Sequence, residues 1–338
     1  MIVDQEIQWV DADYNIYPFK WNTVDLSRYL TAGDHTILIS GLVDYTGGSR
    51  DWCDMGALTV SGGITVAEKQ IDPRNWLTPS VDKYGLSLGD CIGINFVFDG
   101  VATSDEVTFH IGETTLESKG LNGGKYVAYV AAAQMTDEIT VKVNGRAVGE
   151  TYCVKTYADA ILAGEYSDET KALVTEMLNY GAASQVYFDY NTENLAAELT
   201  DRKLPDDFGA DTESSFADNI SGLNYYGASL LLRGKTAVRF YFSGDVTNCV
   251  FTVGEQTYTP VEKDGLWYVE ISNIAPNQLN TTITLNVTCG EETIQVVYGP
   301  MNYIERMYER SSNTALKDTI VAMYYYYTAA VAYLNSLA

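Results

Sequence analysis

Short runs of alternating apolar and polar residues dominate the chain up to about residue 155 and return between about residues 223 and 300. Val107–Ile111 and Ile139–Val143 are clear examples. A period of two residues is typical of half-buried β-strands. Asn-Gly or Asp-Gly pairs at 122–123, 144–145 and 264–265 separate such runs, and these pairs favour tight hairpins. About six short strands in roughly 70 residues favour an immunoglobulin-like antiparallel β-sandwich.

The apolar period lengthens to that of a helix at two places. Residues 167–169, Ser-Asp-Glu, predict an N-cap and an acidic first turn, and apolar positions then step by three and four up to Tyr187. A shorter helix is expected over 156–163, ending near Gly164, so that the two helices form a hairpin. The second hairpin is expected to have Ser312 as cap. We expect each hairpin to pack on the neighbouring sheet through an apolar face, which in the second is Ile320, Met323, Tyr327, Ala330 and Leu334.

The two helical regions are copies of each other. Residues 157–188 align with residues 303–334 at an offset of 146 without a gap, and the strand regions before them align with small gaps. Similarity at a fixed spacing indicates a duplicated structural unit. We expect the repeated tyrosines to serve packing in both copies; these are the pairs Tyr157/Tyr303, Tyr180/Tyr326 and Tyr187/Tyr333.

The predicted fold class is α+β, with an N-terminal β region followed by two duplicated units, each a β-sandwich with a C-terminal helical hairpin. An acidic segment containing Pro205 and Gly209 separates the copies and is typical of a linker. The predicted divisions are a β-rich region 1–80, repeat 1 over 81–200 (sandwich 81–155, hairpin 156–200), a linker 201–222, and repeat 2 over 223–338 (sandwich 223–300, hairpin 301–338).

Composition narrows the function classes. The chain has 338 residues, which suggests two or three domains. It carries 45 acidic and 21 basic residues, a net charge of −24, so nucleic acid and anionic membranes should repel it. No apolar run is long enough to span a membrane, and the first residues do not resemble a signal peptide. We interpret the chain as a fragment of a longer exported protein.

Cysteine and histidine are sparse. The five cysteines form no CxxC pair and there are two histidines, so the sequence predicts neither a zinc site nor a disulfide framework. Cys249 and Cys289 lie on predicted strands of one copy, and a bond between them is left open. Residues 11–15 begin like a calcium loop, but Ile16 and Asn22 occupy the positions where an EF-hand needs Gly and Glu. A looser calcium site is left open, and no cofactor is expected.

No catalytic constellation is evident. His35 and His110 lie on predicted strands without the pattern of a nucleophile beside a base, and no GxSxG, HExxH or Walker motif occurs. Among 45 acids some carboxylates must lie near one another, but most fall in turns and linkers. We therefore predict no catalytic residues, no metal ligands and no enzymatic activity.

Aromatic residues provide the functional hint, because tyrosine and tryptophan are enriched at interfaces. The chain has 26 tyrosines and five tryptophans. The run 324–327 is four tyrosines, which cannot all face one side of a helix. The candidate ligand-binding residues are the four tryptophans of the first 76 residues and two tyrosines of that run, namely Trp9, Trp21, Trp52, Trp76, Tyr324 and Tyr325.

Residues 157–196 resemble an element that recurs in large cell-wall-attached proteins of gut commensal bacteria, where helical hairpins follow strand-rich units in tandem. The resemblance implies a surface-displayed extracellular fragment without activity as an enzyme. Some proteins of this kind bind host immunoglobulin through its variable region, in a superantigen-like manner. We therefore expect a monomer that binds a host protein such as immunoglobulin, without nucleic acid or membrane insertion. A glycan-binding adhesin and a structural spacer of a surface stalk are the alternatives.

Overall fold

A computed structural model of the chain describes residues 79–87, 91–101, 105–121, 124–209, 214–216, 219–220, 222–232 and 236–337, with the short strands 2–3, 6–7 and 37–38. The chain forms two compact units, residues 1–80 with 99–104 and residues 81–98 with 105–338. In the first unit, β1 (Ile2–Val3) pairs antiparallel with β2 (Glu6–Ile7) and β3 (Ile37–Leu38). The second unit contains the elements described below.

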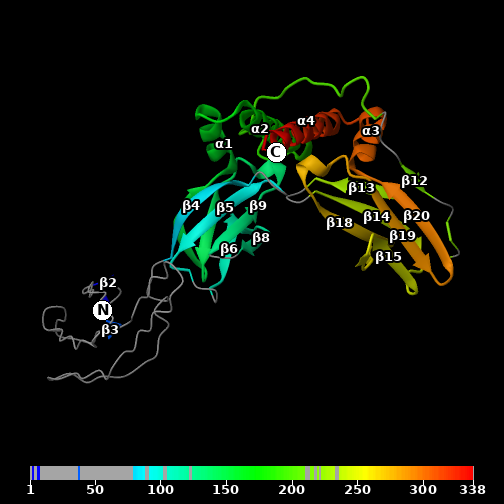
Figure 1. Cartoon of the computed structure of the whole chain (residues 1–338), viewed down its shortest axis with the longest axis horizontal. Coiled ribbons are helices and arrows are strands. Elements are labelled where there is room, and N and C mark those ends of the chain that lie inside the picture. Colours follow the sequence, from blue (N-terminus) through cyan, green and yellow to red (C-terminus); the bar gives the residue numbers. More distant parts are fainter. Residues whose placement is uncertain are drawn as a thin grey trace. The chain divides into compact units, whose positions relative to one another are not determined.

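The second unit is α+β, as the sequence predicts, with antiparallel sheets and four α-helices among its described residues (Figure 1). Its first half contains two sheets that pack face to face, because Phe96 of one sheet stacks on Phe109 of the other at 4.9 Å and both rings are fully buried. The first sheet has the strand order β4 (Ser80–Ser87), β5 (Gly93–Asp99), β9 (Lys125–Tyr129) and β8 (Ser118–Leu121). The second sheet has the order β11 (Arg146–Tyr152), β10 (Ile139–Val143), β6 (Val107–Ile111) and β7 (Thr114–Thr115).

The second half has the same order of elements and of strands in its sheets. Phe242 and Phe251 join its two sheets at 5.3 Å between ring centroids. One strand, β12 (Ser215–Phe216), is additional and pairs with β20 at the edge. One sheet has the strand order β13 (Leu223–Leu231), β14 (Thr236–Gly244), β18 (Leu266–Ile274) and β17 (Val261–Lys263). The other has the order β12, β20 (Glu292–Tyr298), β19 (Ile283–Cys289), β15 (Cys249–Val253) and β16 (Gln256–Tyr258).

The turn chemistry explains two of these hairpins. Asn144 and Gly145 have φ values of 49° and 78°, and Asp264 and Gly265 have 55° and 80°. Positive φ at both central residues is the geometry of a tight hairpin whose twist matches the strands. Side chains in β10 alternate between buried and half-buried positions, as the period of two predicts.

Four helices follow the sheets in pairs: α1 (Val154–Ala163), α2 (Asp168–Phe188), α3 (Pro300–Arg310) and α4 (Thr314–Leu337). The predicted cap of α2 is confirmed, since Thr170 N–H donates to Ser167 Oγ at 3.2 Å. The predicted cap of α4 is wrong. Leu316 N–H donates to Asn313 Oδ1 at 3.1 Å, so the helix begins after Asn313 and not after Ser312. Asparagine is among the preferred N-cap residues, which accounts for the shift.

The long helices α2 and α4 pack against each other, a contact that the sequence analysis does not predict. The rings of Tyr180 and Tyr326 stack at 6.0 Å with 19° between their planes, and Thr319 Oγ1 donates to the backbone oxygen of Ala183 at 3.0 Å. Both tyrosines are buried, and burial raises the pKa of each phenol. Tyr180 and Tyr326 differ by the offset of 146, so the helices meet through equivalent positions.

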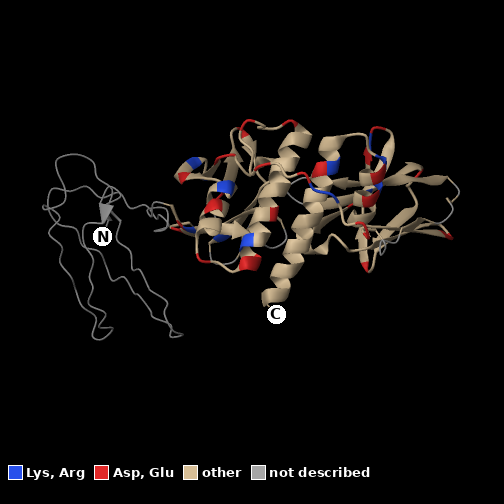
Figure 2. Ribbon diagram, turned by 90° about the horizontal axis from the view of Figure 1, so that it is seen from above, with Lys and Arg blue, Asp and Glu red and all other residues tan. Residues whose placement is uncertain are grey.

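This packing corrects the predicted buried face of α4. Tyr326 is buried where Tyr327 was expected to be, and Leu334 is 41% exposed. Residues 319–323 of α4 are all buried, so the buried face is broader than a single stripe. Most of α4 is uncharged (Figure 2), with Lys317 and Asp318 as its two charged residues.

Replacing Gly181 with alanine is expected to lower stability by about 1 kcal/mol. Glycine to alanine inside a helix ordinarily stabilises by about 0.5–1 kcal/mol. Here the added carbon would lie 2.7 Å from Met135 Sδ and 3.1 Å from the backbone oxygen of Ala132, and overpacking costs about 1–3 kcal/mol. Thermal unfolding measures the change, with the exposed Thr175→Ala in the same helix as control. A higher melting temperature for Gly181→Ala would contradict the close approach.

Candidate binding surface

The predicted ligand-binding residues divide into two groups. Trp9, Trp21, Trp52 and Trp76 lie outside the described residues, as does the possible calcium loop at 11–15. Tyr324 and Tyr325 lie on α4 and are half-buried. Both contact the segment 201–209, which the sequence analysis assigns to a linker.

Tyr325 holds this segment through two contacts. Its hydroxyl donates to the backbone oxygen of Lys203 at 2.9 Å, and the guanidinium of Arg202 lies 4.5 Å from the centre of its ring. Arg202 in turn donates to both carboxylate oxygens of Glu176 on α2, at 2.6 and 2.8 Å. Two-point pairs of this kind are among the stronger ionic contacts. Tyr325 is thus part of a clamp between α2, α4 and the segment.

Tyr324 packs on the same segment further along. Its ring lies 5.1 Å from that of Phe208 in an edge-to-face arrangement, and burial raises the pKa of its phenol. Leu204, between the two contacts, is 6% exposed. The first part of the predicted linker is therefore a packed element. Residues 202–208 cover much of the surface of Tyr324 and Tyr325, so less of that surface can contact a ligand.

A small hollow lies beside this clamp. It has a volume of about 50 Å³, enough for a few water molecules. Burial, and then the negative charge of Asp201, raise the pKa of Asp318 at its edge. The hollow is smaller than the cavities that enclose small-molecule ligands. Its lining comes from α2, α4 and the segment between the copies: Asn179, Ala183, Val186, Leu199, Thr200, Arg202, Ala315, Asp318, Val321 and Ala322.

A group of exposed aromatic side chains lies at the sheet edges of the second half. Phe216 of β12 is 55% exposed and Tyr226 of β13 is 71% exposed. Tyr225, next to Tyr226 in the chain, lies 5.3 Å from the Phe216 ring. We call Phe216, Tyr225 and Tyr226 the edge aromatic patch. Neighbouring exposed apolar groups, unlike scattered ones, mark interaction surfaces.

A β-bulge accounts for the exposure of Tyr226. In the pairing of β13 with β14, Tyr225 is opposite Phe242 and Gly227 is opposite Tyr241, so Tyr226 is the extra residue. Bulges re-aim a side chain relative to the sheet, and they concentrate at edges. Gly227 has a φ of 149°, which few other residues adopt. The Tyr-Gly pair at 226–227 is the one signal in the sequence that could have pointed to this exposed tyrosine.

The equivalent tyrosine of the first half has a different setting. Tyr84, followed by Gly85, is 43% exposed. Its ring lies 4.7 Å from that of Tyr152 and 5.8 Å from that of Tyr157, both edge-on. Tyr84 thus packs along the junction of sheet and helix. The edge aromatic patch is a feature of the second half among the described residues.

The polar groups considered for chemistry are engaged in ordinary contacts. The ring nitrogens of His110 lie 3.0 and 3.3 Å from the hydroxyls of Thr108 and Thr115. His35 lies outside the described part of the chain. In that part, no group of three or more His, Cys, Asp or Glu residues could hold a metal ion. None of the helices described there is long and apolar enough to cross a membrane.

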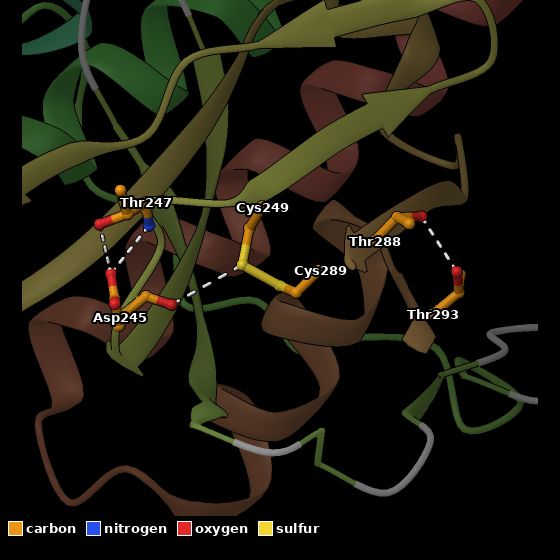
Figure 3. Close-up of a disulfide and its surroundings, with 6 residues drawn as sticks. All are labelled: Asp245, Thr247, Cys249, Thr288, Cys289 and Thr293. Atoms are coloured by element: carbon orange, nitrogen blue, oxygen red, sulfur yellow. Dashed lines mark hydrogen bonds between the residues drawn. A yellow bond between two sulfur atoms is a disulfide. The ribbon is translucent and has the colours of Figure 1, made fainter. Parts of the chain in front are cut away.

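Cys249 and Cys289 form a disulfide between β15 and β19, in contrast to the sequence analysis, which predicts no framework and leaves this pair open (Figure 3). The two residues are opposite each other in the strand register, with 4.1 Å between their Cα atoms. Next to the bond, the Asp245 carboxylate accepts hydrogen bonds from Thr247, which lower its pKa. The described cysteines outside the disulfide are Cys91, which is buried, and Cys153, which is half-buried.

No protein-family model matches this sequence, and no curated protein matches it in a sequence comparison.

Proposed function

We propose that the chain is a non-catalytic extracellular binding module of a bacterial surface protein, and that it contacts a protein partner through the edge aromatic patch. The observation that carries this proposal is the exposure of Phe216 and Tyr226, at 55% and 71%, where Tyr225, the neighbour of Tyr226 in the chain, contacts the Phe216 ring. Burial of one such aromatic side chain is favourable by about 1.5–3 kcal/mol. A partner that covers these two side chains would therefore gain binding free energy from them.

The disulfide supports the extracellular part of the proposal. Bonds such as Cys249–Cys289 form and persist in oxidising compartments and are rare in reducing ones. The bond joins two strands that are already hydrogen-bonded neighbours, so it strengthens a finished sheet. A protein displayed on a cell surface benefits from such a crosslink.

The proposal includes the finer architecture. Each half of the second unit is taken as an immunoglobulin-like β-sandwich followed by a helical hairpin, and the pair as a duplication. Three observations support this: the sheets of the two halves have the same strand order, aromatic rings join each pair of sheets, and the long helices are related by an offset of 146.

The partner we propose is a host protein, with the variable region of immunoglobulin as the case that the resemblance implies. Protein interfaces are enriched in tyrosine and phenylalanine at their centres, and one or two such residues supply most of the binding energy. A glycan partner would use the same rings for stacking on sugars. A spacer would need no exposed aromatic group, so the edge aromatic patch favours a binding module.

Replacing Phe216 and Tyr226 together by serine is expected to reduce the amount of partner retained from human serum and intestinal secretion about tenfold, which corresponds to about 1.4 kcal/mol. Both side chains are exposed, so the fold should persist. The measurement is a pull-down with mass spectrometry of the retained proteins. The matched control is Tyr166→Ser, because Tyr166 is 50% exposed and lies in the first half, between α1 and α2.

The composition of the eluate separates the functions. Retained immunoglobulin that resists free sugars, and that is also obtained with antigen-binding fragments, supports the proposed partner. Glycoproteins released by free sugar would establish a glycan-binding adhesin instead. Equal retention by the double variant and the wild type would place the contact elsewhere, and an empty eluate for the wild type would leave the spacer as the better description.

A further inference from the structure

The sheet with the strand order β13–β14–β18–β17 carries two rows of side chains across its outer face (Figure 1). On β14, Val238, Phe240 and Phe242 point into the core between the two sheets and are fully buried. Side chains alternate along a strand, so Arg239 and Tyr241 lie on the opposite, outer face. Residues that are opposite each other on neighbouring strands share a face, so the strand register identifies the other members of each row.

The first row is apolar. Tyr241 on β14 is opposite Tyr268 on β18, and Tyr268 is opposite Val261 on β17. The two rings lie 6.0 Å apart between their centres with 49° between their planes. Both tyrosines are partly exposed, and Val261 is 48% exposed. We call Tyr241, Tyr268 and Val261 the apolar row.

Open space continues this row onto the fourth strand. Gly227 on β13 is opposite Tyr241 and has no side chain. A methyl group built on Gly227 would have no other atom within 4 Å. The equivalent glycine of the first half is Gly85, where such a methyl group would lie 3.2 Å from the hydroxyl of Tyr157. The second half thus leaves open a space that a helix side chain fills in the first half.

The second row is polar and has no net charge. Ser229, Arg239 and Glu270 are opposite one another on β13, β14 and β18, next to the apolar row. Arg239 Nε donates to Glu270 Oε2 at 2.8 Å, and its guanidinium lies 4.1 Å from the centre of the Tyr268 ring. Ser229 Oγ donates to Tyr241 Oη at 3.2 Å. The polar row therefore holds both tyrosines in place, which lowers the entropic cost of ordering them around a ligand.

We infer that these two rows bind a neutral oligosaccharide. A pyranose ring has an apolar face of C–H groups, which fits the aromatic rings, and a rim of hydroxyls that both donate and accept hydrogen bonds. The polar row matches this rim because it contains donors and acceptors in one neutral group. The net charge of −24 opposes acidic sugars. The site uses no residue of the edge aromatic patch, so it goes beyond the proposed function and does not depend on it.

The first half lacks both rows. Residues 94–98 of β5 correspond to residues 238–242 of β14. In the place of the tyrosine pair, Val97 is opposite Lys125, and in the place of the ion pair, Asn95 is opposite Val127. The same sheet face therefore exists there without aromatic rings and without the arginine–glutamate pair. We expect one oligosaccharide site in the second unit, on its second half.

Calorimetric titration of the full chain with cellohexaose, xylohexaose, mannohexaose and chitohexaose tests this inference. We expect saturable binding of at least one of these neutral sugars and weaker binding of acidic oligogalacturonate. Tyr241→Val installs the residue that the first half has at this position, so the fold should persist, and its affinity should fall about tenfold, the scale of one aromatic contact. Tyr241→Phe keeps the ring and should keep most of the affinity. The control is Tyr166→Val, whose exposed ring lies in the first half, and thermal unfolding confirms that each variant is folded.

Three results would overturn the inference: no saturable binding of any neutral sugar by the wild type, equal affinity of Tyr241→Val, or tighter binding of oligogalacturonate. Loss of a serum protein from Tyr241→Val that free sugar does not release would assign this face to a protein partner instead. Glycoproteins lost by Tyr241→Val, but retained by the double variant of Phe216 and Tyr226, belong to this face. The two proposals can fail separately, because the titration uses purified sugars and the edge aromatic patch is tested by its own double variant.

Discussion

Replacing Cys249 and Cys289 together by valine is expected to lower the free energy of unfolding by about 4 kcal/mol. The two residues are separated by 40 positions, and the loop-closure relation gives about 4 kcal/mol for a crosslink of this length. Valine is the suitable replacement because the equivalent pair in the first half is Val107 opposite Val143, in the same register. The variant therefore keeps the shape of the strand pair and loses the crosslink. Calorimetric unfolding measures the difference.

Two controls isolate the crosslink from packing. Reduction of the wild type should lower its melting temperature toward that of the valine variant, and reduction should leave the variant unchanged. Conversely, Val107→Cys with Val143→Cys is expected to form a disulfide in the first half and to raise the melting temperature there, because those residues are paired across β6 and β10. A wild-type melting temperature that does not respond to reductant would contradict the stabilising role of the bond.

Replacing Gln185 by leucine is expected to cost about 3 kcal/mol, from several lost hydrogen bonds and at least one buried group left without a partner. Gln185 is fully buried on α2. Its Nε2 lies 3.2 and 2.9 Å from the backbone oxygens of Asn191 and Asn194 and 3.2 Å from Thr136 Oγ1, so its two hydrogens are shared among three acceptors. Its Oε1 accepts from Ala196 N–H at 2.8 Å. The Gln185 side chain therefore holds residues 191–196, which follow α2, against that helix.

Leucine has a similar size but no polar atoms, so Ala196 N–H, in a residue that is 1% exposed, would lack its acceptor. Urea unfolding measures the loss. The control is Gln295→Leu, since Gln295 is exposed and makes one side-chain bond, to Asn286. The control is expected to change stability by less than about 0.5 kcal/mol. Equal losses in the free energy of unfolding for the two variants would show that the hydrogen bonds of Gln185 stabilise the fold no more than the one of Gln295 does.

The elements that could be predicted are those whose cause lies within a few residues. Ser167 caps α2 through a bond to Thr170, three residues away. The positive φ values at Asn144 and Gly145 follow from the residue types themselves. The strands of the two halves follow from alternation over five to nine residues. Local patterns such as these predict the same helix cap, turn or strand whatever the surrounding fold.

What could not be predicted depends on contacts between distant residues. Tyr326 is buried because α2, about 146 positions earlier, lies against it, and the periodicity of α4 alone favours Tyr327. Tyr324 and Tyr325 appear exposed in the sequence, because Phe208 and Arg202, which cover them, belong to a segment with the composition of a linker. A two-residue strand such as β12 is too short to produce any pattern.

The same reason applies to the candidate site. Tyr226 is exposed because a bulge in the pairing with β14 makes it the extra residue, and Phe216 is placed by its pairing with Val296.

The stack of Tyr180 on Tyr326 has a consequence for how the chain can be divided. The rings join equivalent positions of the two long helices, as contacts across the axis of a symmetric homodimer join equivalent residues of its two subunits. If the two halves are copies, as we propose, the chain has the organisation of a dimer whose subunits are joined end to end. Fusion replaces an encounter between molecules by a closure within one molecule, so the pairing no longer depends on protein concentration. A boundary drawn between the two halves would divide one compact unit and expose a buried tyrosine of each half to solvent.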